Sequence, residues 1–207
     1  MKEIRLHLWI GVACCLLLAA GACTSTSLTV LQPGEAADGV FRKIAVMGCF
    51  NSPEDRKNFE DGIVTALQKK GCDAVSSIAF MKHGEKHSEK EMEKLFTRQG
   101  LDAILILKVA GLQEERTDIP ETYYYPMEPY VYSWFPYWTD GLGMPIRGGY
   151  HEKHDVVKMD SALFSLKTHK RVWEAQSETK RVQSIAKLAS SLGPSVAKKL
   201  EKEKLIP

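Results

Sequence analysis

The segment from residue 42 to residue 112 alternates short apolar stretches with two capped helices, and this order constrains the fold most. The stretches RKIAVMGCF, AVSSIAF and DAILILKVAGL have the length of strands. The helices between them begin at Ser52 and at Ser88, and Ser88 opens a capping box with Glu91. Strands joined through helices pair in parallel by right-handed crossovers. The segment therefore predicts a parallel sheet with the continuous apolar run 103–107 in its central strand.

Two more strands and a third helix are predicted after an aromatic segment. HDVVKMDSALFSL and KRVWEAQSETK are expected to form an antiparallel hairpin around a turn at 167–170. A last helix is expected from Ser184, and its apolar face continues past Pro194, which favours a kink over two separate helices. The predicted fold class is α/β, a single domain. Its mixed five-stranded sheet has the order 2-1-3-4-5, numbered along the chain, and three helices flank it on both faces.

The amino-terminal residues are typical of a secreted, lipid-modified chain. Lys2 and Arg5 precede the apolar run LWIGVACCLLLAA, which is shorter than the roughly 20 residues of a membrane-spanning helix. The stretch LLLAAGAC resembles a bacterial lipobox that ends at Cys23. The resemblance implies lipid attachment to the Cys23 thiol, cleavage before Cys23 and acylation of the new amino group. The alternatives are an ordinary signal peptide cut at Ala22, with Cys23 incidental, and a retained membrane helix.

This resemblance sets the expected organisation of the chain. It comprises a lipoprotein-type signal peptide at 1–22, a lipidated tether at 23–40 and the α/β domain at 41–207 with an aromatic, proline-rich insert at 119–150. In lipoproteins of Gram-negative cells, an Asp after the cysteine commonly causes inner-membrane retention. Thr24 stands there instead, so the expected location is the outer membrane, facing the periplasm.

The net charge excludes one class of partner. Removing 22 of the 207 residues leaves 185, which suffices for one domain. The formal charge falls from +2 to +1, because Lys2, Arg5 and Glu3 are lost. Nucleic-acid-binding domains usually show a strongly basic face, so no nucleic-acid partner is expected.

Three stretches resemble known envelope proteins. RKIAVMGCFN looks like the opening strand of the curli-secretion lipoprotein and of TolB amino-terminal type domains. LFSLKTHKRVWEAQSET is similar to a hairpin of many outer-membrane lipoproteins of unknown function, and QGLDAILILKV fits their third strand. The resemblance covers about residues 42–207 apart from the insert, and it implies a fold rather than an activity. His169 stands where that hairpin usually has a left-handed Gly, and His tolerates positive φ better than most residues.

Candidate metal-binding and catalytic patterns are incomplete in this sequence. His151 and His154 are three residues apart at the start of a strand, whereas a zinc-protease helix needs a spacing of four. His83 and His87 have that spacing but fall in a charged loop. Cys49 ends a strand, where nucleophiles occur in α/β proteins, yet no base stands beside it in the sequence. The prediction is a protein that is not an enzyme and that uses neither metal nor cofactor.

Cys49 and Cys72 also raise the question of a disulfide. An oxidising compartment permits one, but the predicted sheet places the two residues at opposite ends, and a bridge needs Cα atoms within about 7 Å. Two buried free thiols are therefore expected, with the disulfide as the alternative.

The segment YYYPMEPYVYSWFPYW, residues 123–138, holds nine aromatic residues in sixteen. Its closely spaced prolines exclude a membrane strand, which needs a full ladder of backbone hydrogen bonds. Three interpretations stay open: a loop that covers apolar sheet surface, a platform for a partner, or contact with lipid headgroups. We expect an irregular excursion in which Trp134, Tyr137 and Trp138 form the accessible, partner-binding part.

The expected function is that of a non-enzymatic, lipid-anchored protein that serves envelope assembly or maintenance by presenting its domain to a protein or glycan partner. The main alternative is a subunit of an oligomeric secretion or assembly complex, which makes the chain a homo-oligomer. A third class, an unrecognised hydrolase of envelope material, also stays open.

Overall fold

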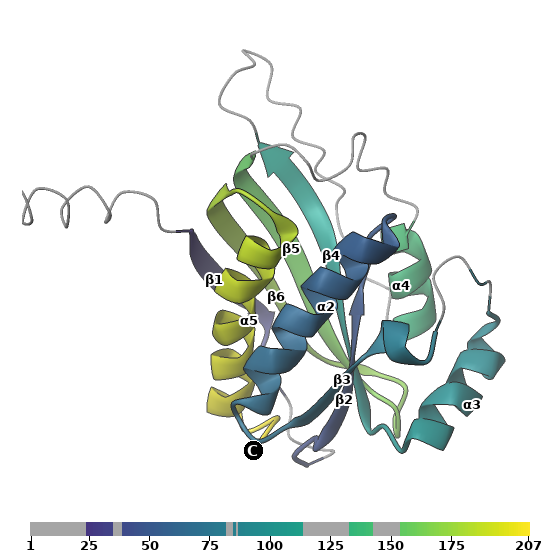
Figure 1. Cartoon of the computed structure of the whole chain (residues 1–207). Coiled ribbons are helices and arrows are strands. Elements are labelled where there is room, and N and C mark those ends of the chain that lie inside the picture. The colour runs from purple at the N-terminus through teal and green to yellow at the C-terminus, as the bar shows by residue number, and fades with distance from the viewer. Residues whose placement is uncertain (1–23, 35–38, 82–84, 86, 114–132, 143–153) are drawn as a thin grey trace, which may run out of the picture.

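The computed structural model describes residues 24–34, 39–81, 85, 87–113, 133–142 and 154–207. They form one mixed six-stranded sheet with helices on both faces (Figure 1). The strands are β1 Ser25–Gln32, β2 Lys43–Gly48, β3 Asp73–Ser76, β4 Ala103–Gln113, β5 His154–Ser165 and β6 Arg171–Val182. The helices are α2 Pro53–Gln68, α3 Glu89–Gln99, α4 Trp134–Leu142 and α5 Ile185–Lys202, with a short 3₁₀ turn, η3, at Ser77–Ala79. Over the described residues, no helix combines the length and the apolar character needed to cross a membrane.

The strand order is β1-β6-β5-β4-β2-β3. Ile44 of β2 lies opposite Ala74 of β3 and Ala103 of β4, and both pairings are parallel. β4, β5, β6 and β1 pair with one another in antiparallel fashion. The predicted mixed α/β sheet is therefore confirmed, but the predicted five strands and three helices are too few. The structure adds β1 beside the last predicted strand and adds α4 within the insert.

The tether predicted over 23–40 is part of the folded domain over Ser25–Gln32, because β1 pairs with β6 along most of its length. Thr26, Leu28 and Val30 point towards the core, while the side chains between them are exposed. The Thr26 hydroxyl lies 2.8 Å from that of Thr179 on β6. This two-residue alternation is the normal pattern of a half-buried strand, and it is present in the sequence.

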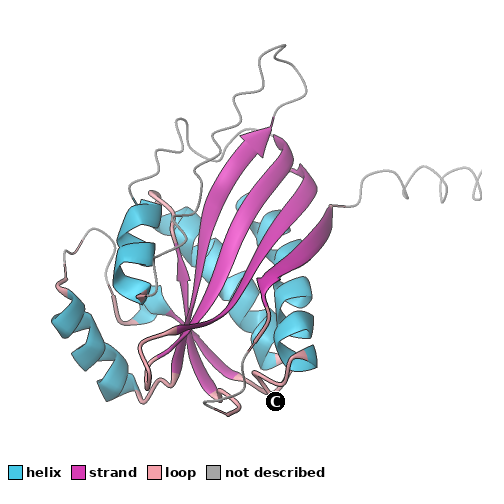
Figure 2. Ribbon diagram, turned by 180° about the vertical axis from the view of Figure 1, so that it is seen from behind, coloured by secondary structure: helices cyan, strands magenta, loops and turns pink. Residues whose placement is uncertain are grey.

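Two separate apolar layers cover the two faces of the sheet. On one face, α2 and α5 pack over the core, with Phe59 and Ile63 of α2 and Leu188 and Leu192 of α5 buried. On the other face, α3 and α4 cover the part of the sheet near β2 and β4, and Phe96 of α3 is buried there. Figure 2 shows strands β1, β6 and β5 free of helices on this second face.

Helices α2 and α5 run side by side in the same direction, and two glycines permit their close approach. A Cβ atom on Gly62 would lie 2.6 Å from the Ala189 Cβ, and one on Gly193 would lie 2.9 Å from the Ala66 Cβ. Both distances are too short for real carbon contacts. α5 continues through Pro194 as a single helix, as predicted, rather than as two.

The hairpin of β5 and β6 agrees with the sequence prediction. His169 adopts φ 57° in the turn, and Trp173 of β6 is fully buried opposite Leu163. The strand predicted over 74–80 is shorter, because β3 ends at Ser76 and the chain turns into η3.

Candidate functional site

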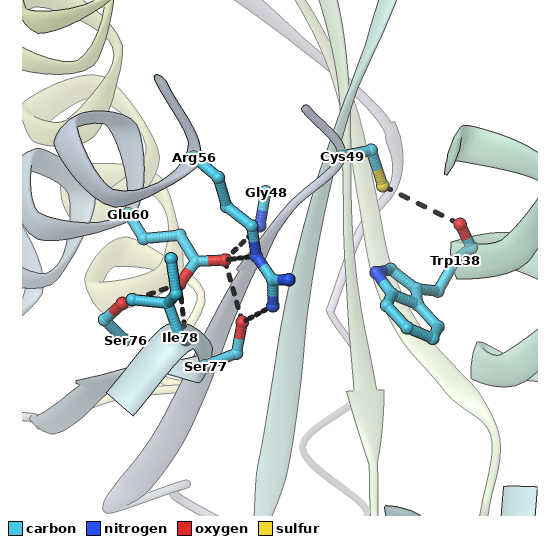
Figure 3. Close-up of polar contacts among 8 residues, drawn as sticks. All are labelled: Gly48, Cys49, Arg56, Glu60, Ser76, Ser77, Ile78 and Trp138. Carbon is cyan, nitrogen blue, oxygen red and sulfur yellow. Dashed lines mark hydrogen bonds and ion pairs between the residues drawn. The ribbon is translucent and has the colours of Figure 1, made fainter. Parts of the chain in front are cut away.

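A fully buried carboxylate, that of Glu60 on α2, is the centre of a hydrogen-bonded network (Figure 3). It accepts five hydrogen bonds of 2.6–3.1 Å, two from backbone N–H groups, two from hydroxyls and one from a guanidinium. The donors are Gly48 N, Arg56 Nε, Ser76 Oγ, Ser77 Oγ and Ile78 N. The network joins α2 to the end of β2 and to the connection between β3 and η3.

Arg56 completes this network and is 3% exposed. Its Nη2 donates to the Ser77 hydroxyl at 2.5 Å, and that hydroxyl donates to Glu60. Both carboxylate oxygens of Glu60 are therefore in use, which suits a structural role. Sequence reasoning missed the network. The sequence pattern that could have indicated it is the i, i+4 spacing of Arg56 and Glu60, because both lie on the helix face that also carries Phe59 and Ile63.

A second polar group lies on the opposite face of the sheet, between β4–β6 and α4. We call it the Lys108 cluster, and its members are Lys108, Tyr137, Asp160, Arg171, Glu174 and Gln176. The Lys108 Nζ lies 4.2 Å from the centroid of the Tyr137 ring, a cation–π contact. Its cross-strand neighbour Asp160 accepts a 3.0 Å hydrogen bond from Gln176 Nε2.

The described members of the Lys108 cluster include charges of both signs. Arg171 Nη1 lies 3.0 Å from Glu174 Oε2, and among the described members of the cluster two cations, Lys108 and Arg171, stand beside two carboxyl groups, Asp160 and Glu174. Lys108, Asp160 and Glu174 are each no more than 5% exposed. Buried charges require such compensation, so the cluster is a compensated interior network.

Burial perturbs the acids of this cluster. It raises the pKa of Asp160 above its usual value, while the hydrogen bond from Gln176 and the charge of Lys108 act in the opposite direction. Burial likewise raises the pKa of Glu174, opposed by Arg171. The pKa of Tyr137 is well above its usual value because of burial and the two nearby carboxyl groups. Its hydroxyl is buried and has no hydrogen-bond partner among the described residues.

The expectation that Trp134, Tyr137 and Trp138 form the accessible part of the insert is wrong. They are 0%, 1% and 4% exposed, because they lie on one face of α4 at i, i+3 and i+4 and pack onto the sheet and α3. Trp134 contacts the ring of Phe96 at 5.2 Å, and Tyr137 that of Phe164 at 5.4 Å between centroids. These three rings therefore cover the sheet.

The irregular conformation predicted for the insert is also wrong for residues 134–142. α4 tolerates Pro136 because a proline in the first turn needs no backbone donor. Pro136 and Thr139 are exposed on its outer side. The other insert residues, 119–132 and 143–150, lie outside the described part of the chain, as does Cys23, the predicted lipid-attachment residue.

Cys49 and Cys72 are buried free thiols, as expected, and the alternative of a disulfide is not realised. Cys49 Sγ donates to the carbonyl oxygen of Trp138 at 3.8 Å (Figure 3), and a carbonyl oxygen cannot act as a base towards a thiol. Burial raises the pKa of Cys72 to about 12, which keeps this thiol protonated.

Histidines were the sequence candidates for metal ligands. His87 Nε2 lies 3.3 Å from Glu85 Oε2, while His83 and His151 and the side chain of His154 lie outside the described part. Over the residues that the structure describes, no group of three or more His, Cys, Asp or Glu side chains could hold a metal ion.

Comparisons with known proteins give distant structural similarity alone. No protein-family model and no curated protein matches the chain. Two solved dodecamers of PelC from Paraburkholderia phytofirmans, one a point variant, align with a TM-score of 0.45 each. The variant is 15% identical, and the alignment covers 84% of this chain and 98% of PelC. For the other the identity is 16% and the coverage 89% and 99%. No conclusion about activity or assembly follows from similarity at this level.

Proposed function

We propose that this protein is a non-enzymatic, lipid-anchored component of the bacterial envelope. It is attached through Cys23 to the outer membrane and faces the periplasm. There its domain acts as an accessory or scaffold for envelope assembly or maintenance, through a protein or glycan partner.

The observation that carries the proposal is the position of Thr24 and β1 on the domain. β1 begins at Ser25, and the Thr24 hydroxyl already donates to the Arg181 carbonyl at 3.1 Å. The Ser191 hydroxyl donates to the Thr24 carbonyl at 3.5 Å. Thr24, the residue that follows Cys23, is therefore held on the domain by two hydrogen bonds, and a lipid at Cys23 would be attached directly beside the folded part.

The buried charges support a non-enzymatic role. Glu60 has both oxygens engaged by five donors, and Lys108, Asp160 and Glu174 of the Lys108 cluster are buried. General acid–base catalysis needs a group within hydrogen-bond reach of a substrate, and these groups are turned into the interior.

The test is to express the full chain in Gram-negative cells supplied with an alkyne analogue of palmitate. The wild type and a Cys72→Ala variant should incorporate the label and sediment with the outer membrane. Cys23→Ala should lose the label and leave that fraction. A Cys23→Ala variant that is still labelled and outer-membrane bound contradicts the proposal.

One observation favours the alternative role as a subunit of an oligomeric assembly. β1 is an edge strand of the described sheet, and its eight residues STSLTVLQ include no charge and no proline. Natural edge strands commonly carry such residues to prevent pairing with other chains. Light scattering of the detergent-solubilised protein tests this role. A defined large oligomer that Thr29→Lys with Leu31→Lys dissociates supports it, and a monomer excludes it.

A further inference from the structure

The lipid anchor of the proposed function leaves the domain almost no tether. The Cα atoms of Cys23 and Ser25 lie at most about 7 Å apart, because the chain extends no more than roughly 3.6 Å per residue. Ser25 is in register with Lys180 near the end of β6. The end of the domain at which β1 begins must therefore lie at the lipid headgroups.

Three basic residues are exposed at this end. Lys180 and Arg181 close β6, and Lys187 lies in the first turn of α5, where Ser184 caps the helix through the Lys187 N–H. Arg181 adopts φ 59°, and its carbonyl accepts the hydrogen bond from Thr24. Lys180 and Arg181 are thus in direct contact with the anchored strand, and Lys187 lies one helical turn before Ser191, which also contacts Thr24.

Two acidic residues lie near the anchored strand: Glu178 of β6, whose carboxylate lies 3.2 Å from Lys158 Nζ, and Asp155 of β5, which falls between the register partners of Lys180 and Val182. Other acidic residues lie further from the anchor. Glu54 and Asp55 are in the first turn of α2, which runs beside α5 but covers β2 and β3, whereas α5 covers β6 and β1 (Figure 1). Charges on a membrane surface act over a Debye length of about 10 Å at 0.1 M salt. The basic residues beside the anchor fall within that distance once Cys23 is lipidated.

We infer that Lys180, Arg181 and Lys187 form a membrane-contact surface for anionic phospholipid headgroups. We call it the basic end. It holds α5 upright on the membrane, with its first turn at the headgroups and its last turn away from them. This inference rests on the proposed attachment through Cys23 and adds the orientation of the domain.

The experiment uses the lipidated protein reconstituted in vesicles of phosphatidylethanolamine and phosphatidylglycerol. A fluorophore is placed at an exposed position at either end of α5, by Gln183→Cys or by Lys202→Cys. The helix between them is about 27 Å long at about 1.5 Å per residue, beyond the range of a spin-labelled headgroup that quenches by contact. Quenching should be several-fold stronger at position 183 than at 202. Equal quenching, or stronger quenching at 202, overturns the inferred orientation.

Charge reversal then tests the basic end itself. Lys180→Glu with Arg181→Glu and Lys187→Glu should reduce the quenching at position 183 in vesicles that contain phosphatidylglycerol. The matched control reverses three exposed lysines at the other end of the domain, Lys69, Lys167 and Lys198, and should leave the quenching unchanged. Equal effects of the two triple variants contradict the headgroup contact.

Mass spectrometry of the reconstituted protein separates the two proposals. A protein that carries lipid at Cys23 but shows no preferred orientation refutes the basic end alone. A protein without lipid refutes the proposed attachment and, with it, this inference.

Discussion

The Arg56 Nε and the Glu60 Oε1 lie 2.9 Å apart in the interior, with side chains 3% and 0% exposed. One residue further along α2, Lys57 and Asp61 form an ion pair with the same i, i+4 spacing, but their side chains are 60% and 48% exposed. The two pairs have equivalent positions in the sequence and different surroundings. A buried pair loses its hydration, so removing one partner leaves the other uncompensated.

The first prediction concerns these two ion pairs. Glu60→Ala should lower the free energy of unfolding by about 3–5 kcal/mol, because it leaves the Arg56 guanidinium buried without its counter-ion. Asp61→Ala should cost less than about 1 kcal/mol, as exposed pairs do. Urea unfolding of both variants measures the difference, and similar losses would mean that the Glu60 network is open to water.

The second prediction concerns the hydroxyl of Tyr137, which is buried without a partner among the described residues. Tyr137→Phe should leave stability unchanged or raise it, because it removes an unpaired polar atom. Tyr137→Ala should cost on the order of 3–5 kcal/mol, since it leaves a cavity under α4. The melting temperatures of the two variants test this, and a clear loss in Tyr137→Phe would show that the hydroxyl is bonded.

The third prediction concerns pH. A carboxyl group with a raised pKa binds its proton more tightly in the folded state. Its contribution to stability is therefore complete below the unfolded-state pKa, 3.8 for Asp160, and is lost as pH rises through the folded-state value. Asp160→Asn, which cannot ionise, should be more stable relative to wild type at pH 7 than at pH 4.

Unfolding free energies of both proteins at the two pH values provide the measurement. The pKa of Glu91 is lowered by the hydrogen bond from the Ser88 N–H, which gives a pH dependence of the opposite sign. Glu91 is present in both proteins, so its effect cancels in the comparison. A difference that does not change with pH contradicts the prediction.

The fourth prediction concerns Trp173, which is fully buried in the core between the sheet and the layer of α2 and α5. Trp173→Ala should lower the free energy of unfolding by about 3–5 kcal/mol. Trp173→Phe should cost less, because part of the ring volume remains. Near-native stability of Trp173→Ala would place β6 wrongly in the sheet.

The fifth prediction concerns thiol reactivity. The pKa of about 12 keeps the Cys72 thiol protonated at pH 8, and the thiolate is the reactive form. Cys49 is 5% exposed. Iodoacetamide should therefore modify neither residue in the native protein and both in denaturant, as read by peptide mass spectrometry. Modification of either residue under native conditions would show that its site opens.

Local signals in the sequence were enough to predict where several helices begin and end. Ser52 and Ser88 cap α2 and α3 through hydrogen bonds from Asp55 N and Glu91 N. Gly100 ends α3 with φ 65°. These features were predictable because a cap or a turn depends on groups only a few residues apart. The continuous apolar run of β4 likewise identified the central part of the sheet.

Distant partners decided the rest. β1 pairs with a strand about 150 residues away, as the contact between Thr26 and Thr179 shows, so its alternating pattern alone does not say which strand it joins. α4 has nine residues and contains Pro136, too short to be stable alone, so its packing on Phe96 and Phe164 makes it a helix.

The same distinction applies to the site. The sequence by itself determined the lipobox resemblance at Cys23, the order of the central elements and the apolar faces of the helices. Tertiary structure alone decided that Trp134 is buried, that Glu60 is structural and that Lys180, Arg181 and Lys187 share one end with β1. Burial and charge compensation arise from contacts between segments far apart in the chain, and local sequence patterns do not encode which segments meet.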